Sequence, residues 1–422
     1  MQLKKSKKGK ITALLASATC SLIGGNTNAA EDRGWQIDSA VLLYSEKDRV
    51  DVVEPVVSAT KTFDDDSILN LKLVADSLTG ASPSGATPSD VPQTFTRPSG
   101  KGSYVTPAGE VPLDDTFKDS RTEFRVQYEY PLSRQMRISG GLAYSKEYDY
   151  TSAVANVGIA RDFFEKNTTV SLALAYANDT IDPEGGVPIP FASMAAPGPD
   201  QPRQGTEEDK TVTDFVLGLT QVINRQTVMQ FNYGYSNADG YLTDPFKIVS
   251  VVDGTSGATL DYVFENRPDT RVKQNLYWKT KHALDNGDVI DFSYRYLWDD
   301  WEVSSHTLDL RYRWIISDKH YLEPHVRYYV QEEAEFYAHN LVDGQVLPSD
   351  VSADPRLGAF DGITYGFKYG YRITPKQEVS LRLEYYEQNG DTVGNPIGIQ
   401  NNFDLFPDLE AVIVQFGYTL RF

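Results

Sequence analysis

The last eleven residues of the chain alternate between apolar and polar or small side chains, and they end on an aromatic residue. Every second position counted back from the end is hydrophobic, namely Phe422, Leu420, Tyr418, Phe416, Val414 and Val412. A period of two places these side chains on one face of a β-strand and the intervening polar or small ones on the other. The segment therefore predicts a strand that separates an apolar environment from water.

The same period of two recurs along the chain. Apolar and aromatic residues alternate with charged or small ones in the segments 124–130, 290–298, 308–316, 365–372 and 379–385. No segment favours a long helix, and no apolar run after residue 30 is long enough for a helical membrane span. The 26 tyrosines and 19 phenylalanines favour a membrane barrel over a soluble sandwich, because barrels concentrate aromatic residues in girdles at both membrane interfaces.

Turn-forming residues divide the chain into hairpins. Short polar turns are expected at 64–66, 132–135, 164–167, 224–226, 285–287, 317–318 and 373–376. Connections of more variable length are expected at 47–49, 78–120, 147–150, 178–210, 237–269, 299–302, 333–359 and 388–408. This alternation gives sixteen strands starting near Trp35, an even number that leaves both ends in the periplasm. We predict an all-β fold: a transmembrane, antiparallel, up-and-down β-barrel of about 16 strands with short periplasmic turns and long extracellular loops.

The N-terminal segment has the features of a secretory signal peptide. Residues 1–10 contain five lysines and no acidic residue, residues 11–25 are apolar or small, and the small residues that follow predict cleavage after Ala29 or Ala30. The expected organisation is a signal peptide at 1–30 and a single outer-membrane barrel domain at 31–422. Because Cys20 is the only cysteine and lies in the signal peptide, the mature chain can form neither a disulfide nor a thiolate metal site.

Charged residues set two further expectations. The net charge of −19 becomes −24 without the five signal-peptide lysines, which argues against nucleic acid as a partner. The predicted inward positions carry both signs: Lys72, Asp76, Arg125, Glu129, Asp291, Arg295, Asp309, Arg311, Arg313, Glu323, Arg327, Arg382, Glu384 and Arg421. These charges could line a hydrated pore, or they could pair across neighbouring strands. We favour pairing, because polar lumens are general to such barrels.

No catalytic or metal-binding constellation stands out. The five histidines are scattered, and His320 and His325 are an odd number of positions apart, so on one strand they would face opposite sides. The acidic tip at 299–302 could hold a cation, although such tips are more often solvated loops. We therefore predict no catalytic residue and no metal site, and we rank a barrel enzyme last among the functions considered.

The terminal strand resembles that of bacterial outer-membrane β-barrels, whose assembly machinery recognises a final phenylalanine. The resemblance implies that Phe422, Leu420, Tyr418 and Phe416 form a barrel-assembly signal. It also implies that the protein is located in the outer membrane of a Gram-negative bacterium. The expected partners are then outer-membrane lipid and the barrel-assembly machinery.

Two segments, 76–82 and 253–259, share the pattern Asp, two residues, Ser or Thr, Gly, Ala, and Ser or Thr. We interpret both as loops, and both resemble the acceptor motif of proteins modified by FAD:protein FMN transferase. In that family FMN is joined through its phosphate to the last hydroxyl, so the resemblance implies Ser82 and Thr259 as acceptors of covalent FMN. Ser77 and Ser82 depart from the usual Gly and Thr, which makes Thr259 the better candidate. The alternative is a pair of flexible loop tips.

Nearly the whole mature chain, most visibly from Trp35 to Gly85, resembles an uncharacterised family of Gram-negative outer-membrane barrels known only as a domain of unknown function. Members tend to be encoded near a flavin transferase and a thioredoxin-like protein. The resemblance thus implies FAD:protein FMN transferase and a redox partner, but no activity. We expect a transport or conduit barrel that carries covalent FMN for extracytoplasmic electron transfer. The alternative is a plain porin-like or structural barrel without cofactor.

Overall fold

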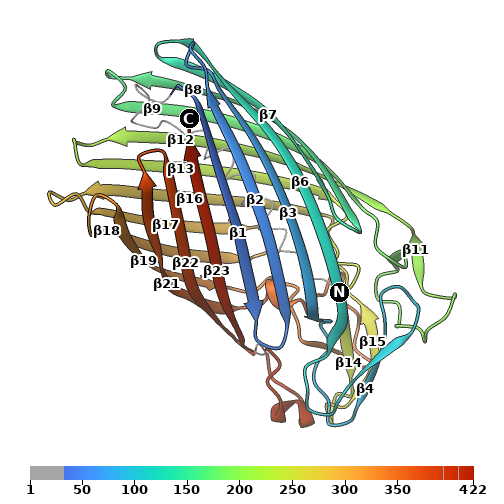
Figure 1. Ribbon diagram of the computed structural model, residues 1–422. Coiled ribbons are helices and arrows are strands. Elements are labelled where there is room, and N and C mark those ends of the chain that lie inside the picture. Colours follow the sequence, from blue (N-terminus) through green and yellow to red (C-terminus); the bar gives the residue numbers. More distant parts are fainter. Residues whose placement is uncertain (1–32, 393, 407) are drawn as a thin grey trace.

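The computed structural model describes residues 33–392, 394–406 and 408–422, and only the backbone of 115–117. These residues form a closed barrel of sixteen antiparallel strands (Figure 1). Each barrel strand pairs with the barrel strands before and after it in the sequence, and the last strand closes the ring by pairing with the first. The predicted all-β, up-and-down barrel is therefore confirmed. The signal peptide predicted at 1–30 lies outside the described residues.

The shortest barrel strands have 11 residues, enough for a tilted strand that crosses a bilayer, which needs about 9–11 residues. The barrel strands are β1 (Trp35–Glu46), β2 (Val50–Thr62), β3 (Ile68–Pro83), β6 (Leu113–Ser133), β7 (Met136–Lys146), β8 (Tyr150–Phe163), β9 (Thr168–Ile181), β12 (Glu208–Val222), β13 (Thr227–Gly240), β16 (Thr270–Ala283), β17 (Val289–Asp299), β18 (Ser304–Ile315), β19 (His320–Gln331), β21 (Phe360–Thr374), β22 (Gln377–Gly390) and β23 (Leu409–Arg421). The loops contain β4 (Gln93–Thr96), β5 (Ser103–Thr106), β10 (Val187–Pro188), β11 (Arg203–Gly205), β14 (Ile248–Val252), β15 (Thr259–Phe264), β20 (Asn340–Val342) and the 3-10 helices η1 (Pro355–Leu357) and η2 (Gly398–Asn402).

The barrel closes between β1 and β23. The Trp35 N–H donates to the Phe422 carbonyl and the Phe422 N–H donates to the Trp35 carbonyl, both at 2.9 Å. Phe416 and Phe422 are 54% and 58% exposed, so the apolar face of the terminal strand points outward as its alternation predicts. Because the ring has no free edge, the strands satisfy one another's backbone groups, as a membrane requires. The role of this strand in assembly stays a prediction.

The two faces of the barrel differ in chemistry. Large apolar side chains on the outer face are exposed, for example Leu73 (49%) and Leu142 (61%). The inner face carries most of the charged residues of the strands, and on β8 and β9 it also carries small residues such as Ala175 and Ala177. Among the helices of the described residues, none is long and apolar enough to cross a membrane. An apolar exterior therefore surrounds a largely polar lumen.

The predicted turns and loops are present at opposite ends of the barrel, but the strands extend further into the loops than predicted. The loop predicted at 78–120 is reduced to 84–112, because β3 runs to Pro83 and β6 starts at Leu113. Gly80 adopts a φ of +135° beside a bulge between these strands, a conformation that side chains rarely tolerate. The local composition suggested a loop, but pairing with β2 and β6 makes this segment part of the wall.

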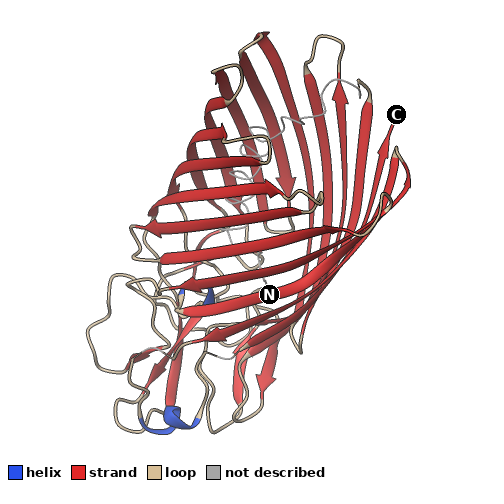
Figure 2. Cartoon of the chain, turned by 90° about the vertical axis from the view of Figure 1, so that its left-hand side faces the viewer, coloured by secondary structure: helices blue, strands red, loops and turns tan. Residues whose placement is uncertain are grey.

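The five longest loops fold together at the end opposite the short turns (Figure 2). We name this assembly the cap; it comprises the described residues of 84–112, 182–207, 241–269, 332–359 and 391–408. Backbone N–H groups donate across loops at 2.8–3.0 Å: Ile248 to Ser84, Phe191 to Phe264, and Ile399 to Ser256. Parallel pairing of β14 with β20 joins the loops 241–269 and 332–359. The cap is therefore one folded unit rather than five separate loops.

Candidate functional site

The barrel lumen holds the candidate site, and most of its charges are paired. Ion pairs join inward residues on the same or adjacent strands: Asp76–Arg121 (2.7 Å), Arg125–Glu123 (2.6 Å), Glu129–Arg137 (3.5 Å), Asp291–Lys279 (3.1 Å), Asp309–Arg311 (3.4 Å), Arg313–Glu323 (3.0 Å) and Arg382–Glu384 (3.4 Å). This is the pairing that the sequence favoured over a fully charge-lined pore. Most lumen charges therefore stabilise the wall itself.

A histidine connects strands in the middle of this wall. His325 on β19 contacts Asp309 on β18 through Nε2 (3.0 Å) and Glu384 on β22 through Nδ1 (2.8 Å). Between β19 and β22 lies β21, whose Gly366 is the register partner of both His325 and Glu384. A Cβ at Gly366 would overlap the backbone of β22, so glycine lets the imidazole reach across a strand. The spacing of the histidines in the sequence did not identify His325 as a contact residue. Only the register of four neighbouring strands brings its imidazole close to Asp309 and Glu384.

Four of the predicted inward cations are exceptions to the pairing. Within the described part of the chain, the cations with no carboxylate oxygen within 4.0 Å are Lys72, Arg295, Arg327 and Arg421. Of these, Arg295 on β17 and Arg327 on β19 line the lumen cavity. In the register, Thr307 on β18 is the partner of Arg295 and Asp309 is the partner of Arg327, and the two positive charges repel each other. Their guanidinium groups lie near aromatic rings, Arg295 at 5.8 Å from Tyr277 and Arg327 at 5.9 Å from Tyr329. The sequence predicted both as inward charges but did not distinguish them from the paired arginines.

Aromatic side chains anchor the cap inside the mouth of the barrel. Trp301, Tyr337 and Phe406 are buried in a cluster that packs on small or medium inner-wall residues, namely Val154, Ala177, Val212 and Ala238. The guanidinium of Arg271 lies 4.1 Å from the centroid of the Trp301 ring and pairs with Asp299. The acidic tip at 299–302 is thus only partly solvated: Asp300 and Glu302 are exposed, whereas Trp301 is buried and Asp299 binds an arginine of the same protein.

Six charged residues form a largely buried cluster in the cap, with three acids and three bases: Asp244, Glu265, Asp354, Lys247, Arg267 and Arg356. Arg356 contacts Asp244 at 2.6 Å, and Arg267 contacts Asp354 at 2.8 Å. Burial raises the pKa of Asp244, but attraction to Arg356 and Lys247 outweighs burial and holds this pKa at about 2. The cluster joins the loops 241–269 and 332–359, and separating them would leave buried charges without partners.

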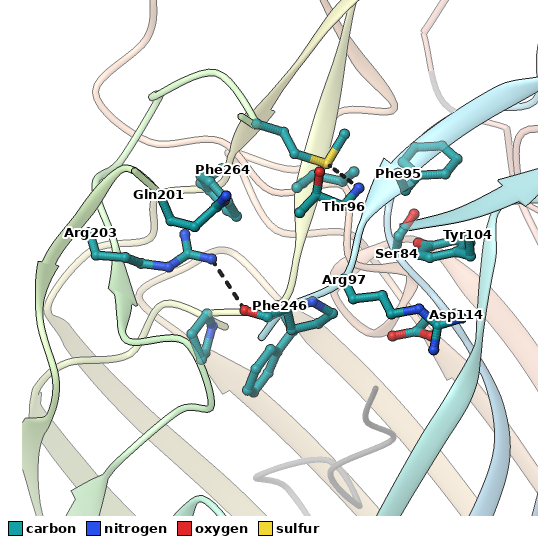
Figure 3. Close-up of a pocket in the computed structure, with 14 residues that line it drawn as sticks. Ser84, Phe95, Thr96, Arg97, Tyr104, Asp114, Gln201, Arg203, Phe246 and Phe264 are labelled. Carbon is teal, nitrogen blue, oxygen red and sulfur yellow. Dashed lines mark hydrogen bonds between the residues drawn. The ribbon is translucent and has the colours of Figure 1, made fainter. Parts of the chain in front are cut away.

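The seam between the loops 84–112 and 182–207 is tightly packed. Arg203 donates to the carbonyl of Pro98 at 3.4 Å, and the N–H of Thr96 contacts the sulfur of Met194 at 3.4 Å (Figure 3). The pocket at this seam has a volume of about 30 Å³, which is room for little more than a water molecule. The seam therefore closes the cap instead of holding an organic ligand.

A cavity of about 890 Å³ lies in the lumen between the cap and the barrel wall. Its charged lining is basic, although the chain has a net charge of −19: the cations are Arg49, Lys247, Lys273, Lys279, Arg295, Arg327 and Arg356, and the acids are Glu46 and Asp354. Apolar residues of β1–β3, β23 and the loop 391–408 also line it. Its volume lies within the roughly 300–1,000 Å³ typical of small-molecule sites.

Comparison with known families identifies the chain. The sequence profile of a family described as "Protein of unknown function (DUF3570)" matches residues 12–420. The chain belongs to the DUF3570 family. The predicted resemblance to an uncharacterised barrel family is thereby confirmed. A comparison of this DUF3570 protein with curated proteins gives no match.

Several solved structures resemble the DUF3570 barrel. The "CymD monoaromatic hydrocarbon channel" matches with a TM-score of 0.43 and 9% identity over 96% of this chain and 93% of that one. A "Bacterial polysaccharide outer membrane secretin" matches with a TM-score of 0.45 and 9% identity over 93% and 99%. For the ferric enterobactin receptor PfeA of Pseudomonas aeruginosa the TM-score is 0.44 and the identity 8%; the match covers 84% of this chain and about half (54%) of the receptor. Likenesses this weak transfer no ligand to the DUF3570 barrel.

The structure separates the two segments that resemble the flavin-acceptor motif. Ser82 lies on β3 opposite Asp114 of β6, is fully buried, and its hydroxyl has no hydrogen-bond partner among the described residues. The interpretation of 76–82 as a loop is therefore wrong, because this segment is part of the barrel wall. A modifying enzyme could reach the Ser82 hydroxyl only before the barrel closes.

The second segment forms a hairpin tip in the cap of the DUF3570 barrel. Asp253 Oδ1 accepts hydrogen bonds from the N–H groups of Thr255 (3.1 Å) and Ser256 (2.7 Å) and from the Ser256 hydroxyl (2.8 Å). These bonds lower the pKa of Asp253. Gly257 has a φ of +72° and packs against the loop 391–408. The conformation of the hairpin thus gives Asp253, Ser256 and Gly257 a structural role, whereas Thr259 is half-buried at the start of β15.

Three buried carboxylates meet beside the loop 147–149, although the sequence predicted no metal site. Oxygen atoms of Asp119, Glu147 and Asp149 all lie within 4.8 Å of one another. Sequence reasoning missed this group because Asp119 lies on β6, one hairpin away. The donors are of the kind that hard cations prefer, but Arg121 is close enough to supply positive charge to Glu147. Nothing else in the described residues points to a cation there.

Proposed function

We propose that this DUF3570 protein is an outer-membrane transport barrel in which the cap closes the lumen and the lumen cavity holds the transported solute. The cavity of about 890 Å³, which residues of the barrel strands and of the cap line together, carries the proposal. Barrels of sixteen strands are wide enough to conduct solutes. A barrel with a purely structural role would gain nothing from a large cavity lined by cations.

The exterior of the barrel supports a location in the outer membrane. Apolar residues face outward around the ring, including Val57, Leu73, Leu174, Leu310 and Phe416, each of them at least 45% exposed. Exposure of so much apolar surface to water is unfavourable, whereas lipid accommodates it. A closed ring of strands also leaves no unpaired backbone group to face lipid.

The cap supports gated transport rather than free diffusion. Its aromatic cluster packs inside the mouth, and its ion cluster holds two loops together. Only three residue pairs join β14 to β20, so this contact can separate while the barrel stays closed. Passage of a solute would therefore require the loops 241–269 and 332–359 to move apart.

A disulfide lock across β14 and β20 tests this proposal. Val251 and Leu341 are register partners on these strands, a geometry compatible with a disulfide, and the mature chain is expected to lack cysteine. The Val251→Cys/Leu341→Cys variant is reconstituted in planar bilayers with each single-cysteine variant as a control. We expect step-like conductance from the reduced double variant and from the controls, and none from the oxidised double variant. Equal conductance in both redox states would contradict gating by the cap.

A second variant tests whether the barrel conducts at all when the cap is opened. A variant in which the loop 241–269 is replaced by a short Gly/Ser linker should conduct continuously if the cap is the barrier. If this variant, the wild type and the reduced double variant are all silent, the transport function is wrong and a structural barrel remains. An enzyme activity ranks last, because the sequence predicted no catalytic residue.

Covalent FMN at Thr259 is a second proposal, supported by the position of this residue in the cap. Its hydroxyl makes no hydrogen bond within the described residues, and it lies at the base of an exposed hairpin. In the reaction, the Thr259 oxygen would bond to the riboflavin-side phosphorus of FAD, the pyrophosphate bond would break, AMP would leave and the hydroxyl proton would pass to solvent. Ser82 is the weaker acceptor, because its hydroxyl is buried in the wall.

Intact mass and in-gel flavin fluorescence test this modification. The protein is co-expressed with an FAD:protein FMN transferase as wild type, Thr259→Ala and Ser82→Ala. We expect added FMN in the wild type and in Ser82→Ala, and none in Thr259→Ala. Unmodified wild type, or modification that persists in a Ser82→Ala/Thr259→Ala double variant, would remove FMN from the proposed function and leave a transport barrel without cofactor.

A further inference from the structure

We infer that the lumen cavity binds a small organic anion with an apolar body, such as an aromatic or aliphatic carboxylate. This inference rests on the proposed transport function and names the substrate class of the same cavity. It is carried by two observations. Two arginines with no carboxylate oxygen within 4.0 Å among the described residues line one part of the cavity wall, and apolar side chains of other barrel strands line another part.

The basic side is built by β16–β19. Arg295 and Arg327 repel each other, and in the described residues neither has a carboxylate within 4.0 Å. An anion placed between two such guanidinium groups relieves their repulsion, and arginine can hold a carboxylate with two parallel hydrogen bonds. Tyr277, Thr307 and Tyr329 also line the cavity here and can donate hydroxyl hydrogen bonds. A cationic ligand would instead meet seven positive side chains and two negative ones.

The apolar side is built by the strands on either side of the barrel closure. Leu42 on β1, Val52 on β2, Leu78 on β3 and Ile413 on β23 line the cavity, together with Phe406 of the cap. Going round the barrel by the shorter path, five strands separate β17 from β1 and two strands separate β19 from β23, so the two sides occupy different parts of the same wall. Val52, Leu78 and Phe406 are already buried, whereas Leu42 and Ile413 are only partly buried. The apolar body of a ligand would cover Leu42 and Ile413, and an inorganic anion would leave them uncovered.

The size of the cavity limits the ligand. At about 890 Å³ it holds one small organic molecule, and the cap encloses it on one side. A polymer would have to thread through the packed aromatic cluster of the cap. The expected ligand is therefore a molecule with one acidic group and a ring or short chain of apolar carbon.

Calorimetric titration of the full-length mature protein in a non-ionic detergent tests this inference. The ligands are phenylbutyrate, the neutral phenylbutanol, the cationic phenylbutylamine and acetate, each with a detergent blank. We expect phenylbutyrate to bind at least tenfold more tightly than phenylbutanol or acetate, and phenylbutylamine not to bind. Shortening the acid to phenylacetate should weaken binding by about fourfold per methylene removed.

Variants of the basic side give the decisive comparison. Arg295→Gln/Arg327→Gln should weaken phenylbutyrate binding at least tenfold and leave phenylbutanol unchanged, whereas Arg295→Lys/Arg327→Lys should retain most of the affinity. Lys72 on β3 is a lumen cation outside the cavity lining, so Lys72→Gln is the matched control and should bind as the wild type does. Equal affinity for the acid and the alcohol, or unchanged binding in the double Gln variant, would overturn the inference.

The two proposals can fail separately, because binding is measured without a membrane. If the reduced Val251→Cys/Leu341→Cys variant conducts but the protein does not prefer phenylbutyrate, the proposed substrate class is wrong and the transport function stands. A protein that binds phenylbutyrate through Arg295 and Arg327 but is silent in every bilayer experiment supports the site and overturns transport.

Discussion

Two stretches of the same lumen wall differ in how they hold charge. Toward the short turns, His325 is held between Asp309 and Glu384, and the nearby arginines have acidic partners. Two positions closer to the cap on β19, Arg327 has no carboxylate oxygen within 4.0 Å among the described residues, and it lines the cavity together with Arg295. The paired charges hold neighbouring strands together. We expect Arg295 and Arg327 to contribute little to the stability of the wall, and we propose that they bind the ligand of the cavity.

The two buried histidines show the same contrast. His325 lies between two carboxylates in the wall, whereas His339 lies in the cap and lines the cavity. Burial lowers the pKa of His339 to about 4. A proton on His339 is therefore unfavourable in the closed cap. We therefore expect His325 to stabilise the barrel and His339 to make the closed cap sensitive to acid.

Removal of His325 should have the largest effect on the paired region. In His325→Ala the carboxylates of Asp309 and Glu384 lose the group that separates them, and breaking such a buried contact costs about 3 kcal/mol. Denaturant unfolding in detergent, followed by tryptophan fluorescence, would measure the loss. His320→Ala is the control, since His320 contacts only Tyr369 and Tyr371 in its surroundings. Equal stabilities of the two variants would mean that the contact across Gly366 contributes nothing.

Acidification should open the cap through His339. Its pKa is lowered in the closed state, so its contribution to closure is complete above the ordinary value of about 6.5 and is lost as the pH falls toward about 4. The lost contribution is at most about 3 kcal/mol. Open probability in bilayers should therefore rise between pH 6.5 and pH 4, and this rise should be absent in His339→Gln. Asp244, with a pKa of about 2, titrates below this range.

A paired cation of the cavity should matter less. Lys279 lies 3.1 Å from Asp291, which also has Lys281 at 3.3 Å. Because Asp291 keeps this second partner, Lys279→Gln should lower the free energy of unfolding by about 0.5 kcal/mol. A loss as large as that of His325→Ala would show that this ion pair is as important to the wall as the contacts of His325.

Neutralising Arg295 and Arg327 should have the smallest effect on the free energy of unfolding. Any change should be a stabilisation, whereas the other variants lose stability. Arg295→Gln/Arg327→Gln removes a repulsion without leaving an acid unpaired, so the free energy of unfolding should stay within about 0.5 kcal/mol of the wild type or rise. The same unfolding assay, without added anion, would measure it. Clear destabilisation would mean that these arginines serve the wall, and the contrast between the two stretches would disappear.

The barrel could be predicted because its signals are local. Alternation along each strand and turn residues between strands are properties of neighbouring positions, and they were sufficient for the strand number and for the outward face of Phe416 and Phe422. Strand ends were less accurate, as at 78–83, because pairing with β2 and β6 overrides a composition typical of loops.

The candidate site could be predicted only in part. The inward direction of Arg295, Arg327 and the paired charges follows from alternation, and pairing was the favoured interpretation. Which cations lack a partner depends on the register between strands, which no single segment determines. The contact of His325 with Glu384 depends in addition on a glycine in the strand between them.

The sequence by itself determined a closed, sixteen-stranded barrel with an apolar exterior, since a period of two and an even number of hairpins leave few other arrangements. It also located Thr259 in a long loop. Only the tertiary structure decided that five loops form one cap, that Ser82 lies in the wall, and that a basic side and an apolar side enclose one cavity. These features arise from contacts between segments far apart in the chain. The free energy of each contact depends on the distance between the two segments, which the local sequence pattern does not determine.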